Sequence, residues 1–488
     1  MFRRHPELEP REVLLEAVDA TGRYWFPGSE GLAVYGRLVF DPADGTTLTL
    51  ADGLSELLPN GEVHEAWGGT RSRIFGQLDH DGHDIKITLL DCIWLSPSSY
   101  HANRLLIGGH FAVEDTTFRQ AIIRLRDLPA WVAQEALAVE VDTALDETER
   151  RELRVHLDRP PAVRAPFARG DLSLDFRWSR EDVDYEQLTI RQWPQFELAY
   201  TAPSPLDEIM SDVSSLHSLL TLCTDGSSAI DSVHLYRPDY PERVLSGEAI
   251  PGTMQKIELR AAFIGSGSRA QQKRREPHRM LVSFDDVGGI ETVATWLNEA
   301  PRLRAIVGSL VTMRTDTIFG ENRFLNVCSA AEGFHRSTIG GSHMPKTEFK
   351  SVKRMLKKYL PRRYREWFDS RMAHANDPSL NQRLKQLADQ LGSAAEDLVG
   401  DVAVWGRAIS KCRNDLTHLE GLREQYDSGD LYWLAEGVFN VTRLCLLLHV
   451  GLTRELLPKL VKSWPIQGAQ DRTLTVIERV AQAQAQRR

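Results

Sequence analysis

The chain has 488 residues, which is too long for one ordinary hydrophobic core, so two or three domains are expected. Hydrophobic residues make up 42% and charged residues 26%, a composition typical of globular proteins. The net charge of −9 excludes a protein that is basic over its whole surface, although it allows a local basic patch.

The cysteines and apolar segments exclude further classes. The five cysteines are scattered and no pair has zinc-binding spacing, so we expect no disulfide framework, no metal site and no cofactor. Residues 1–20 are charged and lack the apolar segment of a secretory signal. The longest apolar run, 444–452, is far shorter than the roughly 20 residues that cross a bilayer. We therefore expect a cytoplasmic protein without a membrane partner.

Residues 1–158 are predicted to form a β-rich domain that resembles a sandwich or barrel, because short apolar or alternating segments follow one another closely. Segments 73–78 and 85–90 read as a hairpin, and its turn explains His80 and His83 better than a metal site does. Other strands are expected at 36–40, 104–110, 121–125 and 153–157, and beyond this domain at 172–178 and 196–200.

Residues 159–315 are predicted to form a mixed α/β second part of this region, separated from the first by the prolines after Arg159. Apolar residues from Leu206 to Leu220 recur at helical spacing and predict an amphipathic helix. Strands are expected at 233–236, 256–263 and 280–284, followed by a second helix over about 290–310.

Residues 321–462 are predicted to form an all-α helical bundle, and 463–488 a C-terminal tail. Helices are expected from about residue 321 to Gly340, and then at 346–368, 380–391, 394–416 and 431–452. Pro361 must kink or divide the second of these. The whole chain is thus expected to be an α+β multidomain protein, β-rich first and helical last.

One pattern within the bundle could carry chemistry. Arg413 and Asn414 precede His418, which gives an arginine, a polar residue and a histidine after four intervening positions. Five positions on an ideal helix separate Arg413 and His418 by roughly 140°, with Asn414 and Thr417 between them, so a polar arc results. A second copy, Arg151 and His156, is rejected because the alternation around it predicts a strand, which would place the two residues on opposite faces.

Several segments resemble a known family. The arginine–histidine spacing is the Rx4–6H pattern of HEPN domains, and residues 324–336 (FLNVCSAAEGFHR) resemble the first helix of ApeA-type HEPN domains. Segments earlier in the chain resemble the β-rich domain that precedes HEPN in ApeA-type anti-phage proteins: 22–27, 36–38, 73–76, 89–92 and 216–221.

The resemblance implies a metal-independent endoribonuclease in which the RNA 2′-hydroxyl attacks the neighbouring phosphorus. His418 can exchange protons near neutral pH, Arg413 can stabilise phosphate charge, and Asn414 can orient His418. Glu332 and Thr417 are candidate supporting residues, and His335 is a weaker candidate for RNA contact. HEPN domains usually pair, so a homodimer or larger homo-oligomer is implied.

The segment from Lys346 to Trp367 is strongly basic and contains interleaved aromatic residues, a combination that suits RNA binding. The alternative to RNA binding is that these charged residues form an ordinary face exposed to solvent. The candidate RNA-binding residues are Lys350, Lys353, Arg354, Lys357, Lys358, Arg362 and Arg363.

The leading hypothesis is a HEPN ribonuclease of an anti-phage, abortive-infection system that cuts RNA, with tRNA as a candidate target and a phage-derived protein as a candidate trigger. An unrestrained ribonuclease would be toxic to its own cell, so we expect regulation, which family analogy assigns to the β-rich domain. The alternative is a non-catalytic HEPN module that binds RNA or nucleotide, or holds a dimer together, beside a ligand-binding β domain.

Overall fold

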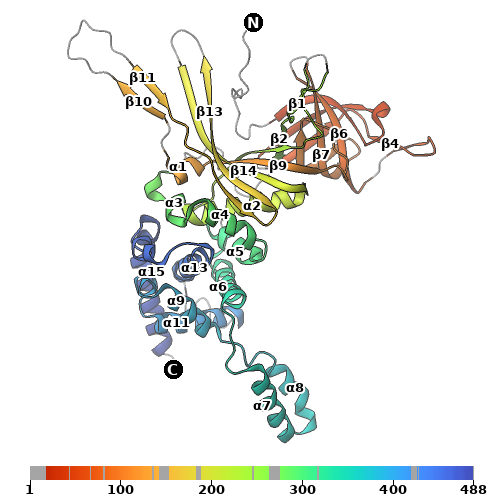
Figure 1. The fold of residues 1–488 in the computed structure, drawn as a ribbon. Helices are drawn as coiled ribbons and strands as arrows, with labels where there is room; N and C mark the ends of the chain where they lie inside the picture. The colour runs from red at the N-terminus through yellow and green to blue at the C-terminus, as the bar shows by residue number, and fades with distance from the viewer. Residues whose placement is uncertain are drawn as a thin grey trace, which may run out of the picture. The chain divides into compact units, whose positions relative to one another are not determined.

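The computed structural model describes residues 18–42, 44–65, 68–80, 83–134, 137–141, 153–182, 188–244, 247–262, 275–315, 318–418, 426 and 428–486. The chain divides into two compact units. The first comprises Met1–Pro277, Ser283–Asp285 and Gly289–Asn298, and the second comprises His278–Val282, Asp286–Gly288 and Glu299–Arg488. The first unit is rich in strands and the second is helical, which confirms the predicted fold class (Figure 1).

Twelve strands of the first unit form one sheet, in the order β12-β13-β14-β9-β15-β16-β8-β3-β2-β1-β6-β7. Because β7 also pairs with β8, the last six strands close into a barrel. These six are β1 (Val18–Trp25), β2 (Val34–Asp41), β3 (Gly45–Leu50), β6 (Thr70–His80), β7 (His83–Ser96) and β8 (Ser99–Ile107). The predicted hairpin of 73–78 and 85–90 is confirmed as the β6–β7 pair.

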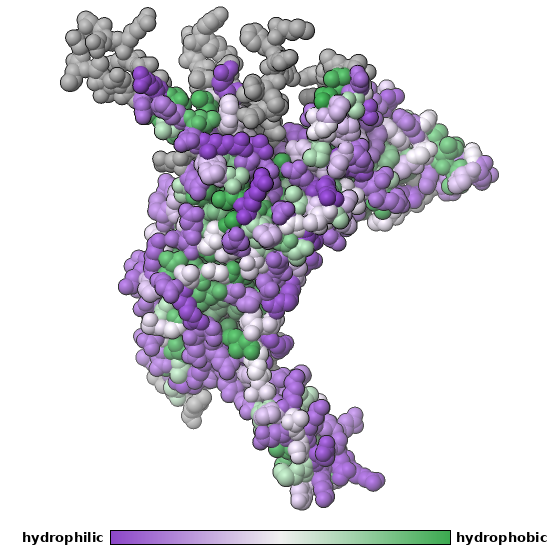
Figure 2. Space-filling view, viewed as in Figure 1, coloured by the Kyte–Doolittle hydropathy of each residue, from purple (hydrophilic) through white to green (hydrophobic). Residues whose placement is uncertain are grey.

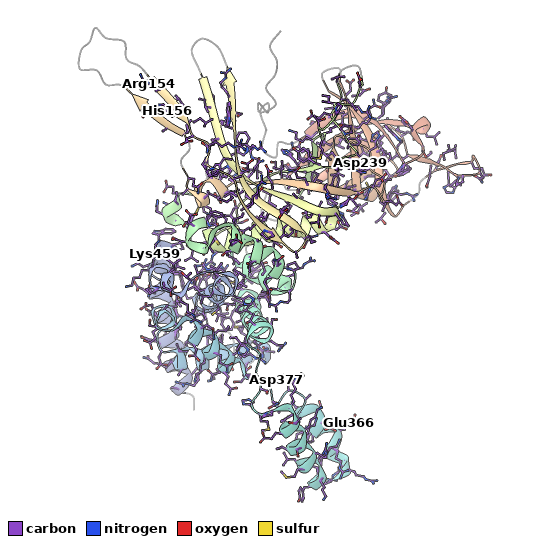
Figure 3. All side chains as sticks on the ribbon, viewed as in Figure 1. Arg154, His156, Asp239, Glu366, Asp377 and Lys459 are labelled. Atoms are coloured by element: carbon purple, nitrogen blue, oxygen red, sulfur yellow. The ribbon has the colours of Figure 1, made fainter. Side chains whose placement is uncertain are left out.

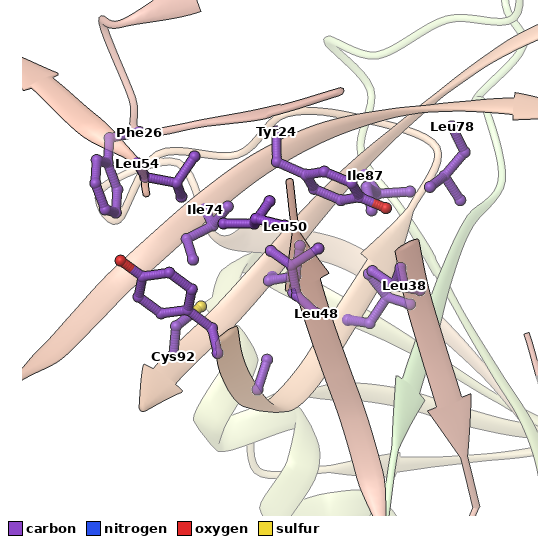
Figure 4. Packing of buried hydrophobic residues seen from close by; sticks show 14 residues of the cluster. Tyr24, Phe26, Leu38, Leu48, Leu50, Leu54, Ile74, Leu78, Ile87 and Cys92 are labelled. Carbon is purple, nitrogen blue, oxygen red and sulfur yellow. The ribbon is translucent and has the colours of Figure 1, made fainter. Parts of the chain in front are cut away.

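The barrel interior is filled by side chains. Alternate residues of each strand point inward, as the period of two requires, and they form one buried cluster that includes Tyr24, Leu38, Leu48, Ile74, Ile87 and Leu105 (Figure 4). Gly76 lies directly against the Tyr24 ring, and a Cβ at this position would be 2.8 Å from that ring. The interior of the barrel is therefore a packed core.

The open half of the sheet continues from β8 through β16. Strand β8 pairs with β3 over residues 99–102 and with β16 over residues 104–107, so one strand links both halves. The open half contains β9 (Thr117–Leu125), β12 (Val163–Phe167), β13 (Gly170–Asp182), β14 (Leu188–Pro205), β15 (Ile230–Tyr236) and β16 (Ile257–Ala261). Strands from both 1–158 and 159–315 thus share one sheet, and the predicted boundary between these parts stays a prediction.

Helices and small hairpins complete this unit. The predicted amphipathic helix is confirmed as α2 (Leu206–Thr224), whose buried Asp212 accepts a hydrogen bond from the Tyr200 hydroxyl of β14 at 2.8 Å. Further elements of this unit are β4 (Ser55–Leu57) with β5 (Val63–Glu65), β10 (Leu137–Val141) with β11 (Leu153–Leu157), and α1 (Leu128–Val132).

Two predictions between residues 280 and 310 are wrong. The expected strand at 280–284 is absent because residues 277–279 form a 3-10 turn and α3 (Phe284–Val287) begins at the expected strand's end. The expected helix at 290–310 is two helices, α4 (Gly289–Glu299) and α5 (Arg304–Thr315), because Pro301 disfavours helical continuation between them.

The second unit is a bundle around α13 (Ser428–Val450), which packs against α6, α9, α10 and α15. Its other helices include α5 and α6 (Gly320–Thr338), which contact each other, and α9 (Leu380–Leu391), α10 (Ala394–Val399), α11 (Val402–His418), α14 (Leu457–Leu460) and α15 (Trp464–Gln486). By length and composition Gly429–Val450 could cross a membrane, but 83% of its apolar window is buried in the structure, as in the core helix of a bundle. The predicted tail at 463–488 contains α15, which packs on α11 and α13.

Local signals explain where these helices begin. Ser379 and Gln382 form a reciprocal capping box at the start of α9. The predicted helix at 394–416 is divided because Gly400 adopts φ +67° and the Asp401 carboxylate accepts hydrogen bonds from the backbone N–H groups of Ala403 and Val404, at 2.8 and 2.9 Å.

The basic segment forms two helices that stand apart from the rest of the bundle (Figure 1). Helix α7 (Lys346–Tyr359) is followed by a 3-10 turn (Arg362–Tyr364) and α8 (Arg365–Arg371), so the predicted break at Pro361 is confirmed. None of the three elements has a buried residue. At the base, the Asn376 side chain donates to the Met344 carbonyl and accepts from its N–H, both at 3.0 Å. We call residues 343–376 the basic arm.

Candidate active site

Arg413 lies near the end of α11, at a point where this helix contacts α6. Its Nη2 atom is 3.5 Å from Oε2 of Glu332 on α6, and the two side chains are 36% and 23% exposed. A partly exposed guanidinium beside a carboxylate keeps some of its N–H donors accessible to a ligand. The structure thus brings together Arg413 and Glu332, which are far apart in the sequence.

His418 is the last residue of α11, five positions after Arg413. The helix continues through both residues, so their Cα positions differ by about 7.5 Å along its axis. The side chain of His418 lies outside the described part of the chain, so its approach to Arg413 stays a prediction.

The two polar residues between them differ in their surroundings. Asn414 is exposed, and its role in orienting His418 stays a prediction. Thr417 donates its hydroxyl hydrogen to the Arg413 carbonyl oxygen at 2.7 Å. This bond occupies the donor of Thr417 and is the back-bond to the carbonyl four residues earlier that threonine often forms within a helix.

A buried chain of hydrogen bonds supports this end of α11. Gln484 of α15 donates to the Ala408 carbonyl at 3.2 Å and to the Tyr426 hydroxyl at 3.0 Å, and Tyr426 donates to the Asp415 carboxylate at 3.0 Å. Tyr426 and Gln484 could not be assigned to this site from the sequence, because no local pattern connects either residue to a position so distant in the chain.

The residues beneath the site are packed and unreactive. Burial raises the pKa of the Cys412 thiol, and burial together with Cys412 and Glu332 raises the pKa of Cys328. Thiols held protonated in this way are poor nucleophiles.

His335, a weaker candidate for RNA contact, is fully buried, which argues against such a contact. Its Nε2 atom is 2.5 Å from Oε1 of Gln386, and Nδ1 is 3.2 Å from the Arg383 guanidinium. Burial lowers its pKa, and the Arg383 charge adds to this effect against the opposing hydrogen bond to Gln386. A neutral ring that donates from Nε2 and accepts at Nδ1 fits both neighbours.

The basic arm separates its cations onto two sides of α7. Lys353 and Lys357 both contact Asp369 of α8, with Lys353 Nζ 3.2 Å from the carboxylate. A second set recurs every four residues and is exposed, and among the described residues no ion pair joins it to an acidic side chain: Lys346, Lys350, Arg354 and Lys358. We call these four residues the cationic stripe.

Aromatic and apolar side chains are exposed on the same arm, beside its hydrophilic surface (Figure 2). Tyr359 is 80% and Trp367 59% exposed. Arg363 lies over the Tyr364 ring at 4.7 Å, and Arg362 is also exposed. Helices that expose both cations and aromatic rings have the chemistry of a surface that contacts nucleic acid.

The rejected candidates lie elsewhere. His156 is on β11 and pairs with Glu140 across the β10–β11 hairpin at 3.4 Å, with half of its side chain exposed (Figure 3). Arg151 and the side chains of His80 and His83 lie outside the described residues. Among the described residues, no three His, Cys, Asp or Glu side chains form a group that could hold a metal ion.

Two family models match the chain in sequence order. The model of ApeA N-terminal domain 1 matches residues 19–296, more than half of the chain, and the model of the Apea-like HEPN domain matches residues 325–456. The second match contains α11 and most of α6, and therefore both Arg413 and Glu332. No curated protein and no solved structure matches the chain. The chain therefore belongs to the ApeA-type HEPN proteins, a family with a general ribonuclease role in anti-phage defence.

Proposed function

We propose that the protein is a metal-independent HEPN endoribonuclease of bacterial anti-phage defence, with Arg413 and His418 in its active site. The observation that carries the proposal is the partly exposed guanidinium of Arg413, held beside Glu332 on the helix that ends at His418. A fixed cation and a titratable imidazole are the two groups that phosphodiester cleavage by an internal hydroxyl requires.

Each residue has a distinct role in the proposed reaction. One histidine takes the proton of the RNA 2′-hydroxyl as its oxygen attacks phosphorus, and an acid protonates the departing 5′-oxygen. Arg413 stabilises the charge that grows on the phosphate oxygens. Glu332 holds the guanidinium in place through their 3.5 Å contact. The products are a 2′,3′-cyclic phosphate and a 5′-hydroxyl.

We place the reaction at a homodimer interface, where one subunit's His418 acts as base and its partner's as acid. A single site offers one imidazole, whereas the reaction moves two protons. The basic arm holds the RNA backbone through its cationic stripe, because phosphate neutralisation supplies most of the sequence-independent affinity. The cytoplasm is the expected location, and tRNA is the first substrate to test.

The first experiment compares RNA cleavage by the parent with that by Arg413→Ala and His418→Ala, in excess chelator and with total RNA or tRNA. His156→Ala and Arg407→Ala are matched controls, because they remove the same residue types from the rejected motif and from the exposed side of α11. We expect the parent and both controls to yield 2′,3′-cyclic phosphate ends and the two site variants to yield none. The same set is compared in phage-infected cells, so that any phage trigger is present.

The outcomes are distinct. If the site variants protect cells and cleave RNA as the parent does, the assigned residues are wrong. If the parent binds RNA through the arm but cleaves none in infected cells, the non-catalytic alternative holds. Cleavage that disappears in chelator would indicate a metal-dependent nuclease.

The dimer is tested by co-expressing the parent with His418→Ala. If both histidines of a pair are needed and subunits mix randomly, an equal mixture retains about one quarter of the parent's activity per dimer. Subunits that work independently would retain about one half, and that result would contradict the shared site.

A further inference from the structure

A cavity of about 250 Å³ opens on one face of the twelve-stranded sheet in the first unit. It lies over β9, β13, β14 and β15, with contributions from Arg159 and Met254 outside these strands. Its lining residues are Gln120, Ile122, Arg159, Phe176, Arg177, Trp178, Trp193, Gln195, His234, Tyr236 and Met254. We call this cavity the sheet pocket.

The floor of the sheet pocket combines buried polar groups with a buried indole. Gln195 and His234 are 5% and 4% exposed. The Trp193 indole N–H donates to Oε1 of Gln195 at 3.2 Å, and the Gln195 amide donates to Glu197 at 2.8 Å, so the amide orientation is set. Fixed polar groups at the bottom of a small cavity select a ligand with a matching polar edge.

The rim of the pocket is cationic because its carboxylates lie deeper than its guanidinium groups. The side chains of Arg159 and Arg177 are each 40% exposed, whereas those of Asp175 and Glu197 are 10% and 16% exposed. Arg159 Nη2 is 2.8 Å from both Asp175 oxygens, and Arg177 Nη2 is 3.2 Å from Asp175 and 3.1 Å from Glu197.

These buried carboxylates orient the arginines and leave part of each guanidinium open to solvent. Arg159 contacts Asp175 through a single nitrogen, and a guanidinium carries five N–H donors on three nitrogens. Planar forks of this kind match phosphate oxygens.

The walls between floor and rim are aromatic. Tyr236 is partly exposed and lies on the same face of the sheet as Trp193 and Gln195, whereas the strand register turns the Phe176 and Trp178 side chains to the opposite face. Arg124 lies over the Trp193 ring at 4.4 Å, so the indole that forms the floor is fixed on one side. Aromatic side chains offer flat surfaces for a planar ring.

We infer that the sheet pocket binds a mononucleotide, with the base against the aromatic walls, its polar edge at Gln195 and His234, and its phosphate at Arg159 and Arg177. A metal ion would meet two guanidinium groups, and inorganic phosphate would not use the aromatic walls. The cavity is near the lower end of the roughly 300–1,000 Å³ typical of ligand sites, so it suits a mononucleotide better than a dinucleotide.

This inference does not rest on the proposed nuclease. The pocket belongs to the first unit, whereas Arg413 belongs to the second, and nucleotide binding can be measured without RNA cleavage. Binding of a nucleotide there would allow the β-rich domain to act as a sensor of that nucleotide.

The test is isothermal titration of the full-length protein with the ribonucleoside mono- and triphosphates, with adenosine and guanosine, and with inorganic phosphate alone. At least one nucleotide should bind more tightly than its nucleoside and more tightly than phosphate. Arg159→Gln should weaken nucleotide binding roughly ten- to hundred-fold, the value of a charged hydrogen bond, and leave nucleoside binding nearly unchanged. Tyr236→Leu should weaken both.

Arg164→Gln on β12 is the matched control and should bind like the parent, because Arg164 is exposed and does not line the pocket. Thermal melts identify a variant that fails to fold, and Tyr236→Phe then replaces Tyr236→Leu, with binding that should be retained. A short RNA with and without a 5′-phosphate distinguishes a free nucleotide from a nucleotide at a strand end.

Three results would overturn the inference. The first is no binding of any nucleotide at millimolar concentration, and the second is binding that Arg159→Gln and Tyr236→Leu leave unchanged. The third is phosphate that binds as tightly as every nucleotide.

Discussion

Removal of three cations from the cationic stripe is expected to flatten the salt dependence of RNA binding. The variant is Lys350→Gln, Arg354→Gln and Lys358→Gln, three exposed residues at intervals of four on α7. Lys353 and Lys357 are left intact because their contacts with Asp369 already satisfy part of their charge. Since α7 has no buried residue, the substitutions should leave the fold unchanged.

The expected size follows from counterion release. Each phosphate contact with single-stranded RNA contributes about 0.7 to the slope of log affinity against log salt, so three lost contacts reduce the slope by about 2. Between 50 and 200 mM salt, the parent should therefore lose about 20-fold more affinity than the variant does. Fluorescence anisotropy with a labelled single-stranded RNA, measured with the His418→Ala background to prevent cleavage, gives both slopes.

The matched control removes three exposed basic residues elsewhere, Arg164→Gln, Arg336→Gln and Lys462→Gln. It changes the net charge equally, so it separates local contact from the overall field of the protein. Equal slopes for the parent and the stripe variant would refute the assigned RNA surface. A control that flattens the slope as much as the stripe variant would show that only net charge matters.

Three further predictions concern stability. Tyr426→Phe removes a buried hydroxyl that bonds to Asp415 and Gln484, so the free energy of unfolding in denaturant should fall by about 1–2 kcal/mol; an unchanged value would show that this hydrogen-bond chain is not formed. Gly76→Ala brings a Cβ to 2.8 Å from the Tyr24 ring and should cost about 1–3 kcal/mol by overpacking, and full stability would contradict a packed barrel. Burial lowers the pKa of His335 in the folded state from 6.5, so the unfolded state binds the proton more readily. The contribution of the neutral His335 ring to the free energy of unfolding is therefore complete above pH 6.5 and is lost as pH falls toward the lower pKa of the folded state. His335→Gln should remove this loss when unfolding is measured at neutral and mildly acidic pH, and an identical pH dependence in parent and variant would argue against a buried neutral ring.

The local spacing of apolar residues predicted much of the fold and located the candidate site. The helical spacing from Leu206 to Leu220 located α2, the alternating segments around residue 80 located the β6–β7 hairpin, and Pro361 divided the basic segment. These features depend on residues close in sequence, whose spacing alone decides which face is apolar or where a backbone donor is missing. Local spacing also predicted a helix for Arg413 and His418 and a strand for the rejected pair, Arg151 and His156.

The predicted boundaries of helices were wrong where a single residue ended a helix although the apolar pattern continued. Pro301 and Gly400 each divided a helix whose hydrophobic spacing ran on past it. The turn at 277–279 displaced a strand that composition alone favoured.

Only the tertiary structure determined which distant residues meet. It closed the barrel by pairing β7 with β8, set Glu332 of α6 beside Arg413 of α11, and placed α15 against the helix that ends at His418. It also buried His335 and gathered the sheet pocket from four strands and two loops. Sequence spacing determines the face on which a side chain lies, whereas its partner depends on the free energy of packing summed over the whole chain, which no local pattern contains.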